Sequence, residues 1–271
     1  MSEKQNHSPK YPVQTLEKAL EIIEILAGEE AGDGLGISDL NRKLGIGKST
    51  IHRILDTMVA YRYVEKTPDK NKYRLSWRFF QLGSAIPRQR NLANLDMSIL
   101  EELCDKYGET VNVGVRVDDG VVIASKVDPE TTLKASLHVG QREPLHATAL
   151  GKVLLSEVET AKVEDLLKDQ EFKAYTNNSI ISLGGFLEEL QKVRRQGYAI
   201  DNEEFCFGLS CIAMPIRDHK NEIVAAVSVS GPSFRMTFNK IMDIQQNLNT
   251  ACCQLSKYLG NSKGCQEAAN E

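Results

Sequence analysis

The sequence predicts two domains of different class, a small and mostly helical domain followed by a larger α+β domain. Up to about residue 60, apolar residues recur at helical spacing, whereas from residue 110 valines alternate with polar residues and helices then intersperse with strands. Charge divides the chain in the same way. Residues 41–80 hold ten Lys or Arg and three acids, a net charge of +7, and the rest carries −11. A basic segment on an acidic body indicates a polyanion-facing module joined to a second domain.

Two helices are expected before residue 46. The segment TLEKALEIIEILAG (15–28) predicts a helix whose buried candidates include Leu16, Leu20, Ile23 and Leu26. A shorter helix follows in SDLNRKLG, with Ser38 as its N-cap and Gly45 at its C-terminal end. Both are too short to stand alone, so we expect them to pack against a third helix.

The stretch GIGKST (45–50) has two interpretations, a phosphate-binding loop or the start of a DNA-reading helix. A P-loop requires G-x-x-x-x-G-K-[ST] after a buried strand. Here Arg42 stands where the first glycine is required, and the preceding residues predict a helix. After the stretch, apolar residues at 51, 54, 55, 58 and 59 form one helical stripe. The sequence therefore excludes the P-loop and favours a helix-turn-helix.

A basic hairpin completes this first domain. The segment YVEKTPDKNKYRL (63–75) predicts two short strands around a Pro-Asp-Lys-Asn turn. Three helices and such a hairpin make a winged helix-turn-helix, expected over residues 11–75, whose third helix enters the major groove of double-stranded DNA. The expected DNA contacts are Lys48, Ser49, Thr50, His52, Arg53 and Thr57 on that helix, and Lys70 and Lys72 on the wing.

The second half reads as a linker and an α+β domain. Residues 76–95 predict a linker helix broken near Pro87, whose aromatic face serves either intramolecular packing or a dimer contact. A hairpin turns at Asp118-Asp119-Gly120, and a second one joins CIAMPI to EIVAAVSVSG. Three helices are expected between the hairpins, the last ending at Gly197.

Several of these segments together resemble the IclR-type transcription regulators. The similar stretches include GISDLNRKLGIGKSTIHRILDTMVAYRYVEK, PLHATALGKVLLS, GYAIDNEEFCFGLSCIAMPIRD and VSVSGP, in the family's order from about residue 11 to 260. The resemblance implies that residues 96–260 form a GAF-like effector domain. It also implies a homodimer, or a dimer of dimers, on a near-palindromic operator, acting as a repressor or an activator. One departure is Gly47, where many members carry proline, which at helix position N1 pre-sets φ.

The resemblance further implies an effector pocket for a small organic acid. Ala149 and Leu150 would offer backbone amides at the start of a helix, and the opposite wall would be lined by Asp201, Cys211, Ser228 and Ser230. Amides at a helix start and serine hydroxyls both suit a carboxylate. Because Asp201 repels an anion unless it is protonated or accepts from a ligand hydroxyl, we expect an oxo-, hydroxy- or aromatic acid.

Two other functions compete with this interpretation. Cys206 and Cys211 could join His146 at a metal or report redox state, which predicts a cysteine-based sensor. No spacing specifies a Cys-His nucleophile pair, so we expect no enzyme activity, no cofactor and no resident metal. There is no secretory signal and no apolar run that spans a membrane, which favours the cytoplasm. The tail, residues 261–271, is expected to be disordered.

Overall fold

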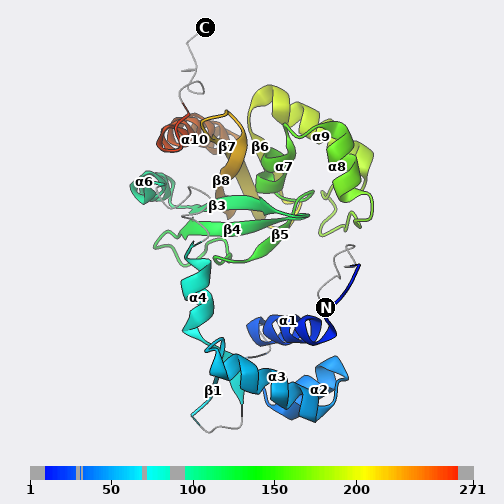
Figure 1. Ribbon diagram of the computed structural model, residues 1–271. Coiled ribbons are helices and arrows are strands. Elements are labelled where there is room, and N and C mark those ends of the chain that lie inside the picture. Colours follow the sequence, from blue (N-terminus) through cyan, green and yellow to red (C-terminus); the bar gives the residue numbers. More distant parts are fainter. Residues whose placement is uncertain (1–9, 29–30, 32, 69–71, 86–94, 262–271) are drawn as a thin grey trace. The chain divides into compact units, whose positions relative to one another are not determined.

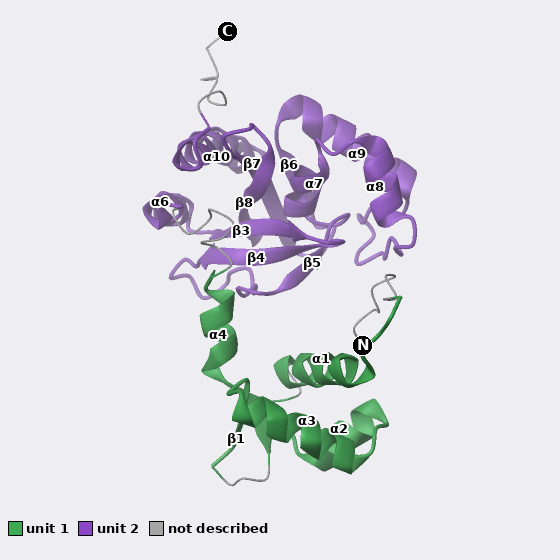
Figure 2. Cartoon of the chain, viewed as in Figure 1, with its two compact units in different colours: residues 1–93 green, residues 94–271 purple. Residues whose placement is uncertain are grey.

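The computed structural model describes residues 10–28, 31, 33–68, 72–85 and 95–261 (Figure 1). The chain divides into two compact units, residues 1–93 and 94–271 (Figure 2). The first is mostly helical and the second is α+β, which confirms the predicted fold classes. Pro87, Lys70 and the tail expected to be disordered lie outside the described residues, apart from Asn261.

The N-terminal unit is a winged helix-turn-helix, as predicted. Its elements are helices α1 (Gln14–Ala27), α2 (Ile37–Leu44) and α3 (Lys48–Ala60), and the antiparallel strands β1 (Val64–Lys66) and β2 (Tyr73–Leu75). Leu35 adds a backbone bridge to Tyr73 of β2. This bridge ties the segment before α2 to the wing, so the hairpin is anchored to the helical body.

The core of this unit corrects the expectation for α1. Ile22 and Leu26 are buried, and Ile23 is partly buried against them, but Leu16 and Leu20 are 56% and 51% exposed. The C-terminal half of α1 therefore supplies most of its packing on α2 and β2. In the N-terminal half, Ala19 is partly buried against the core, whereas Leu16 and Leu20 face solvent within the described residues.

The start of α2 corrects the expected N-cap. Gly36 occupies that position, and its backbone N–H donates to the Asp39 carboxylate at 3.2 Å, whereas Ser38 lies inside the helix. The end is as predicted: Gly45 has φ of 69°, in the left-handed region that favours glycine, and its N–H donates to Asn41 O. The Asn41 side chain also donates to Ile46 O at 2.7 Å. These contacts fix the turn that leads into α3.

Helix α4 (Trp77–Gly83) begins the expected linker and has a divided aromatic face. Phe79 packs edge-on against Tyr63, with ring centroids 5.4 Å apart. Trp77 and Phe80 contact each other but are 78% and 69% exposed. Intramolecular packing thus accounts for one of the three rings, and two remain open on the surface.

The C-terminal unit is built on one antiparallel sheet of six strands. Both hairpins form as predicted, the first through a two-residue turn at Asp118 and Asp119. In spatial order the strands are β5 (Arg142–Pro144), β4 (Gly120–Val127), β3 (Thr110–Val117), β8 (Ile223–Pro232), β7 (Leu209–Arg217) and β6 (Ala199–Asn202). The short strands β5 and β6 therefore form the two edges of the sheet.

Helices cover both faces of this sheet (Figure 1). On one face, α6 (Met97–Tyr107) and α10 (Phe238–Tyr258) pack against each other and against β3 and β7. On the other face lies α7 (Ala149–Leu155), followed outward by α9 (Leu183–Gln196) and α8 (Thr160–Leu167). All three helices predicted between the hairpins are present, and α7 is the one in direct contact with the sheet.

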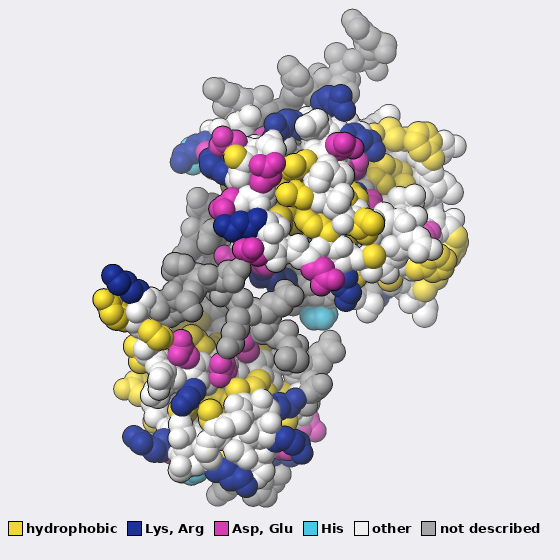
Figure 3. All heavy atoms as spheres, turned by 90° about the vertical axis from the view of Figure 1, so that its right-hand side faces the viewer, with side chains coloured by type: hydrophobic (Ala, Val, Ile, Leu, Met, Phe, Trp, Pro, Cys, Tyr) yellow, Lys and Arg dark blue, Asp and Glu magenta, His cyan; other side chains and the backbone are white. Residues whose placement is uncertain are grey.

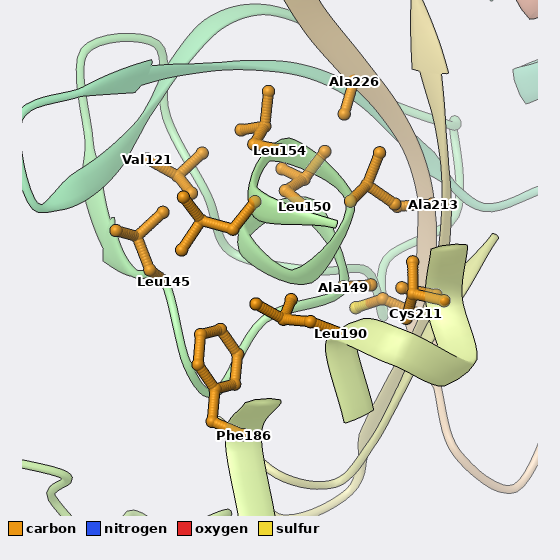
Figure 4. Packing of buried hydrophobic residues seen from close by; sticks show 14 of the residues in the cluster. Val121, Leu145, Ala149, Leu150, Leu154, Phe186, Leu190, Cys211, Ala213 and Ala226 are labelled. Atoms are coloured by element: carbon orange, nitrogen blue, oxygen red, sulfur yellow. The ribbon is translucent and has the colours of Figure 1, made fainter. Parts of the chain in front are cut away.

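Helix α7 is buried on every side. Figure 4 shows Leu150 and Leu154 lying between the helix and Ala226 of the sheet, with Leu190 and Phe186 of α9 behind it. The approach is close at Gly151, where an added Cβ would lie 2.2 Å from Leu145 O. A side chain cannot be accommodated there, so glycine sets how near α7 comes to the chain that precedes it.

Candidate DNA-binding face and effector pocket

Helix α3 buries one face and presents the other. Its apolar stripe, Ile51, Ile54, Leu55 and Met58, lies in the core as predicted. The predicted DNA contacts on this helix lie on the open side. Lys48, Ser49, His52, Arg53 and Thr57 are exposed, and Thr50 is half-buried.

The two cations of α3 are free to meet an anion. In the described part of the chain neither Lys48 nor Arg53 takes part in an ion pair, whereas Arg42 pairs with Asp39 and Arg74 with Glu65, both at 2.8 Å. Lys and Arg side chains gather on the face of this unit seen in Figure 3. An exposed helix start with unpaired cations provides both the amides and the charge that phosphate groups require.

The start of α3 corrects the place given to Gly47. It is the N-cap, with φ of −59° and ψ of 140°, and the helix proper begins at Lys48. The N–H groups of Thr50 and Ile51 both donate to Gly47 O. Because this φ lies within the range that proline adopts, the glycine fits here without requiring its special freedom.

One of the two predicted DNA contacts on the wing, Lys72, lies among the described residues. Lys72 is exposed beside the Tyr73 strand, and its backbone O accepts from Thr67 N at 3.0 Å. This bond closes the wing just before its tip. Lys70, the other predicted contact, is not among the described residues.

A pocket lies between α7 and the sheet of the C-terminal unit. All six predicted effector residues lie on it, two from α7 and four from β6, β7 and β8. The lining residues are Leu137, Glu143, Thr148, Ala149, Leu150, Asp201, Phe205, Leu209, Cys211, Ser228 and Ser230. The cavity measures about 10 Å³, room for about one water molecule. Ligand pockets are typically of about 300 Å³ or more, so this one is too small for an organic acid as it stands.

The helix start at the pocket leaves two amides open. Thr148 caps α7: its hydroxyl accepts from Gly151 N at 3.2 Å, and its O accepts from Lys152 N at 3.1 Å. The preceding amides, of Ala149 and Leu150, have no acceptor within the described residues. These are the donors that the sequence interpretation assigned to a carboxylate.

Hydroxyl and thiol groups form the sheet side of the pocket. Cys211 of β7 is paired with Asp201 of β6 on one side and with Ser230 of β8 on the other. Ser228 lies two residues before Ser230, on the same face of β8. Asn112 of β3 lies behind the serines, with Nδ2 3.4 Å from each hydroxyl. Its buried Oδ1 has no hydrogen-bond partner among the described residues. Sequence reasoning missed Asn112, since a polar residue between valines reads as an outward strand position.

Two buried carboxyls face the pocket. Asp201 is 2% exposed, and burial, together with the neighbouring Glu204, raises its pKa to about 7 although it accepts from Glu204 N. Glu143 is 5% exposed, and burial and Asp201 raise its pKa to about 7. Glu143 was missed as well. It stands in REPLH beside Arg142, where no apolar alternation marks a buried strand.

A buried ion pair supports α7 from behind. Lys152 is 1% exposed on its side chain, and its Nζ donates to Glu204 Oε1 at 2.5 Å and to Ile200 O at 2.8 Å. In the described part of the chain Glu204 Oε2 has no hydrogen-bond partner, and burial raises the pKa of Glu204. Through Glu204 N and Asp201 this pair connects α7 to the pocket wall.

The residues of the metal hypothesis do not converge. Cys206 is exposed and Cys211 is buried, while His146 Nε2 lies 3.1 Å from Lys173 O and its ring packs on Phe172. Burial lowers the pKa of His146. Across the described ranges, no group of three or more His, Cys, Asp or Glu is placed to hold a metal ion. In those same ranges no helix is long and apolar enough to cross a bilayer.

Comparison with known proteins identifies the class. A model described as the IclR helix-turn-helix domain matches residues 15–68, and one described as "Bacterial transcriptional regulator IclR C-terminal" matches residues 85–257. The regulator KdgR of Escherichia coli is 33% identical over 248 residues, covering 92% of this chain and 93% of that protein. The repressor IclR of the same organism is 31% identical over 233 residues, covering 85% and 84%.

Solved structures agree in fold. The Thermotoga maritima IclR crystal structure has a TM-score of 0.74 at 29% identity, covering 91% of this chain and 99% of its own. An IclR homologue from Microbacterium hydrocarbonoxydans, complexed with 4-hydroxybenzoate, has a TM-score of 0.79 at 22% identity, covering 91% and 99%. A winged helix-turn-helix with free cations, joined to a pocket-bearing α+β unit, defines a DNA-binding transcription regulator rather than an enzyme. The chain belongs to the IclR family of bacterial transcriptional regulators.

Proposed function

We propose that the C-terminal unit binds a small organic acid in the pocket beside α7, and that this binding changes the affinity of the winged helices for their operator. The carboxylate would accept from the amides of Ala149 and Leu150 and from the hydroxyls of Ser228 and Ser230. Cys211 and Asp201 would lie along the rest of the ligand. IclR-family regulators bind DNA, and the M. hydrocarbonoxydans homologue was solved with a hydroxylated aromatic acid.

One observation carries this proposal: two open amides and two serines, from segments far apart in the chain, line the same pocket. Each group alone has an ordinary structural role. Together they make a concave site of hydrogen-bond donors in which an anion is satisfied without a buried Lys or Arg.

The small volume of the pocket suggests how binding is transmitted. With room for about one water molecule, it admits an acid only if α7, Leu137 or Phe205 moves. The acid then favours the opened form by its differential affinity for the two forms. We infer that the opened form carries the changed operator affinity, whether the effect is release or recruitment.

On the DNA side, Lys48, Ser49, Thr50, His52, Arg53 and Thr57 of α3 are proposed to contact the operator, with Lys70 and Lys72 on its flanks. We also propose that the protein acts as a homodimer or a dimer of dimers on a near-palindromic site. Exposed apolar residues of the N-terminal unit support association, namely Leu16 and Leu20 of α1 and Trp77 and Phe80 of α4. Trp77 and Phe80 also contact each other, so they form one exposed apolar pair, and adjoining exposed apolar side chains mark interaction sites.

The test combines two measurements on the full chain. Calorimetric titration with small oxo-, hydroxy- and aromatic acids identifies binding, and operator affinity is then measured with and without the acid. Ser228→Ala with Ser230→Ala should weaken acid binding about tenfold or more while leaving operator affinity without acid unchanged. Ser233, one residue beyond the end of β8 and outside the pocket lining, provides the control variant Ser233→Ala. If no acid binds, or binding leaves operator affinity unchanged, the proposal is wrong.

A cysteine-based sensor is the second candidate, because Cys206 is exposed in the segment that carries Phe205 of the pocket. It predicts that mild oxidation or a chelator changes operator affinity, and that Cys206→Ser abolishes this response while acids have no effect.

A further inference from the structure

Glu143 and Asp201 reach the pocket from opposite edges of the sheet. Glu143 is the middle residue of edge strand β5, and Asp201 belongs to edge strand β6, yet both line the cavity beside α7. The sheet therefore curls far enough to place one carboxyl on each side of the serines of central strand β8. A ligand bound at those serines therefore has a carboxyl acceptor on each side, Glu143 on one and Asp201 on the other.

Within the described ranges, Glu143 has no partner that explains its burial. It is 5% exposed, and no hydrogen bond or ion pair of its carboxyl is found among the described residues. Leaving a buried polar group unsatisfied costs about 1–3 kcal/mol, and more for a charged one. Asp201 differs, since its carboxylate already accepts from Glu204 N at 2.7 Å. A buried, unpartnered carboxyl aimed into a cavity indicates a partner that arrives with the ligand.

The chemistry of that partner follows from the lining. Amides and serines supply donors at the centre, which suit the carboxylate of an acid, and the described lining holds no Lys or Arg. The flanking carboxyls require donors from the ligand. A hydroxyl both donates and accepts, so it satisfies an ionised or a protonated carboxyl, whereas an ammonium satisfies only the ionised one. Burial raises the pKa of both carboxyls to about 7, so the two are not fully ionised near neutrality.

We propose that Glu143, together with Asp201, forms a hydroxyl-recognising subsite, so that the effector is an acid bearing at least two hydroxyl groups. This inference rests on the proposed function and narrows its ligand class from organic acids in general to polyhydroxy acids. Glu143 is thereby a specificity-determining residue: it selects among acids and leaves the carboxylate site intact.

Matched acids test the subsite on the full chain by calorimetry. The four-carbon probes are butyrate, 2-hydroxybutyrate, the 2,3,4-trihydroxybutyrates and 2-aminobutyrate, and the six-carbon pair is hexanoate with the hexonates. We expect affinity to rise with hydroxyl number, by about tenfold or more per well-placed hydroxyl, for at least one stereoisomer. Glu143→Gln keeps size and removes the charged acceptor. It should weaken the best polyhydroxy acid at least about tenfold and leave the unsubstituted acid unchanged or tighter.

Glu130→Gln, an exposed acid in the same unit, is the matched control and should change neither. Thermal unfolding of each variant confirms that the fold is kept. Equal affinity for substituted and unsubstituted acids, preference for 2-aminobutyrate, or an equal loss for both classes in Glu143→Gln would each overturn the subsite while leaving acid binding intact. Absence of binding by every probe, with operator affinity unmoved, would instead count against the proposed function.

Discussion

Replacing Lys152 by methionine tests how the pocket helix is held. The substitution keeps most of the apolar part of the side chain and removes its ammonium; the Lys152 side chain is 1% exposed. Lys152 donates to Glu204 at 2.5 Å and to Ile200 O at 2.8 Å, and lies 3.5 Å from Glu189 Oε1. Without it, the Glu204 carboxylate, whose Oε2 already lacks a partner, stays buried with no cation beside it.

Removing one partner of a buried ion pair costs about 3–5 kcal/mol, because the remaining charge is left desolvated. We expect the lower end of this range, about 3 kcal/mol at pH 7, since Glu204 can take up a proton and its pKa is already raised by burial. A carboxyl whose pKa is raised in the folded state makes the folded protein less stable as the pH rises, because the unfolded chain gives up that proton more readily. The deficit should therefore be larger at pH 8 than at pH 5.5.

Urea unfolding followed by far-UV circular dichroism measures the free energy of unfolding, with the C-terminal transition fitted separately. Glu204→Gln in the Lys152→Met background should recover about 1–2 kcal/mol, because the orphaned charge is gone. Lys192→Met is the matched control: it approaches the same Glu189 at 3.5 Å, but its side chain is 59% exposed, so its effect should stay below about 0.5 kcal/mol. Equal effects of the two lysine substitutions would refute a dominant role for the buried pair.

Three further outcomes are expected. Arg53→Ala should weaken operator binding by about 1–3 kcal/mol and relax the sequence preference, because Arg53 is assigned to a base. Lys72→Ala should weaken binding to all sequences alike and reduce the salt dependence of the binding constant by about one unit of log–log slope. Titration of labelled DNA measures both effects, and unchanged binding would contradict the assignment. Gly47→Pro should raise the free energy of unfolding by about 0.4–1 kcal/mol, because the φ of Gly47 is already −59°. A loss of stability or of operator affinity in this variant would contradict the prediction. Folding raises the pKa of Asp201 and of Glu143 to about 7, so the unfolded chain releases these protons at lower pH. Stability should therefore fall by about 2.5 kcal/mol for each group, about 5 kcal/mol together, between pH 5 and pH 8. Asp201→Asn with Glu143→Gln should flatten that profile, and a flat wild-type profile would contradict the reasoning.

Local patterns predicted the elements well. The apolar stripe of α3, the hairpin at Asp118 and the glycine ends at Gly45 and Gly197 are all found as expected, because each depends on neighbouring residues. The incorrect predictions concern burial, which depends on how distant segments pack. Leu16 and Leu20 have the helical spacing of core residues, but both are more than half exposed, and no described segment packs over them.

The sequence by itself determined the class of protein: a basic winged helix-turn-helix and an α+β unit, with spaced motifs that place it in the IclR family. Apolar periodicity and local charge can be read from the sequence because each depends on residues only a few positions apart. Six residues of the pocket were expected from the sequence, but only the tertiary structure added Glu143 to its lining. The curl of the sheet brings Glu143 of one edge strand and Asp201 of the other to the same cavity, 58 residues apart in the chain. Burial then shifts the pKa of both carboxyls, and burial is a property of the packed fold that no short stretch of sequence expresses.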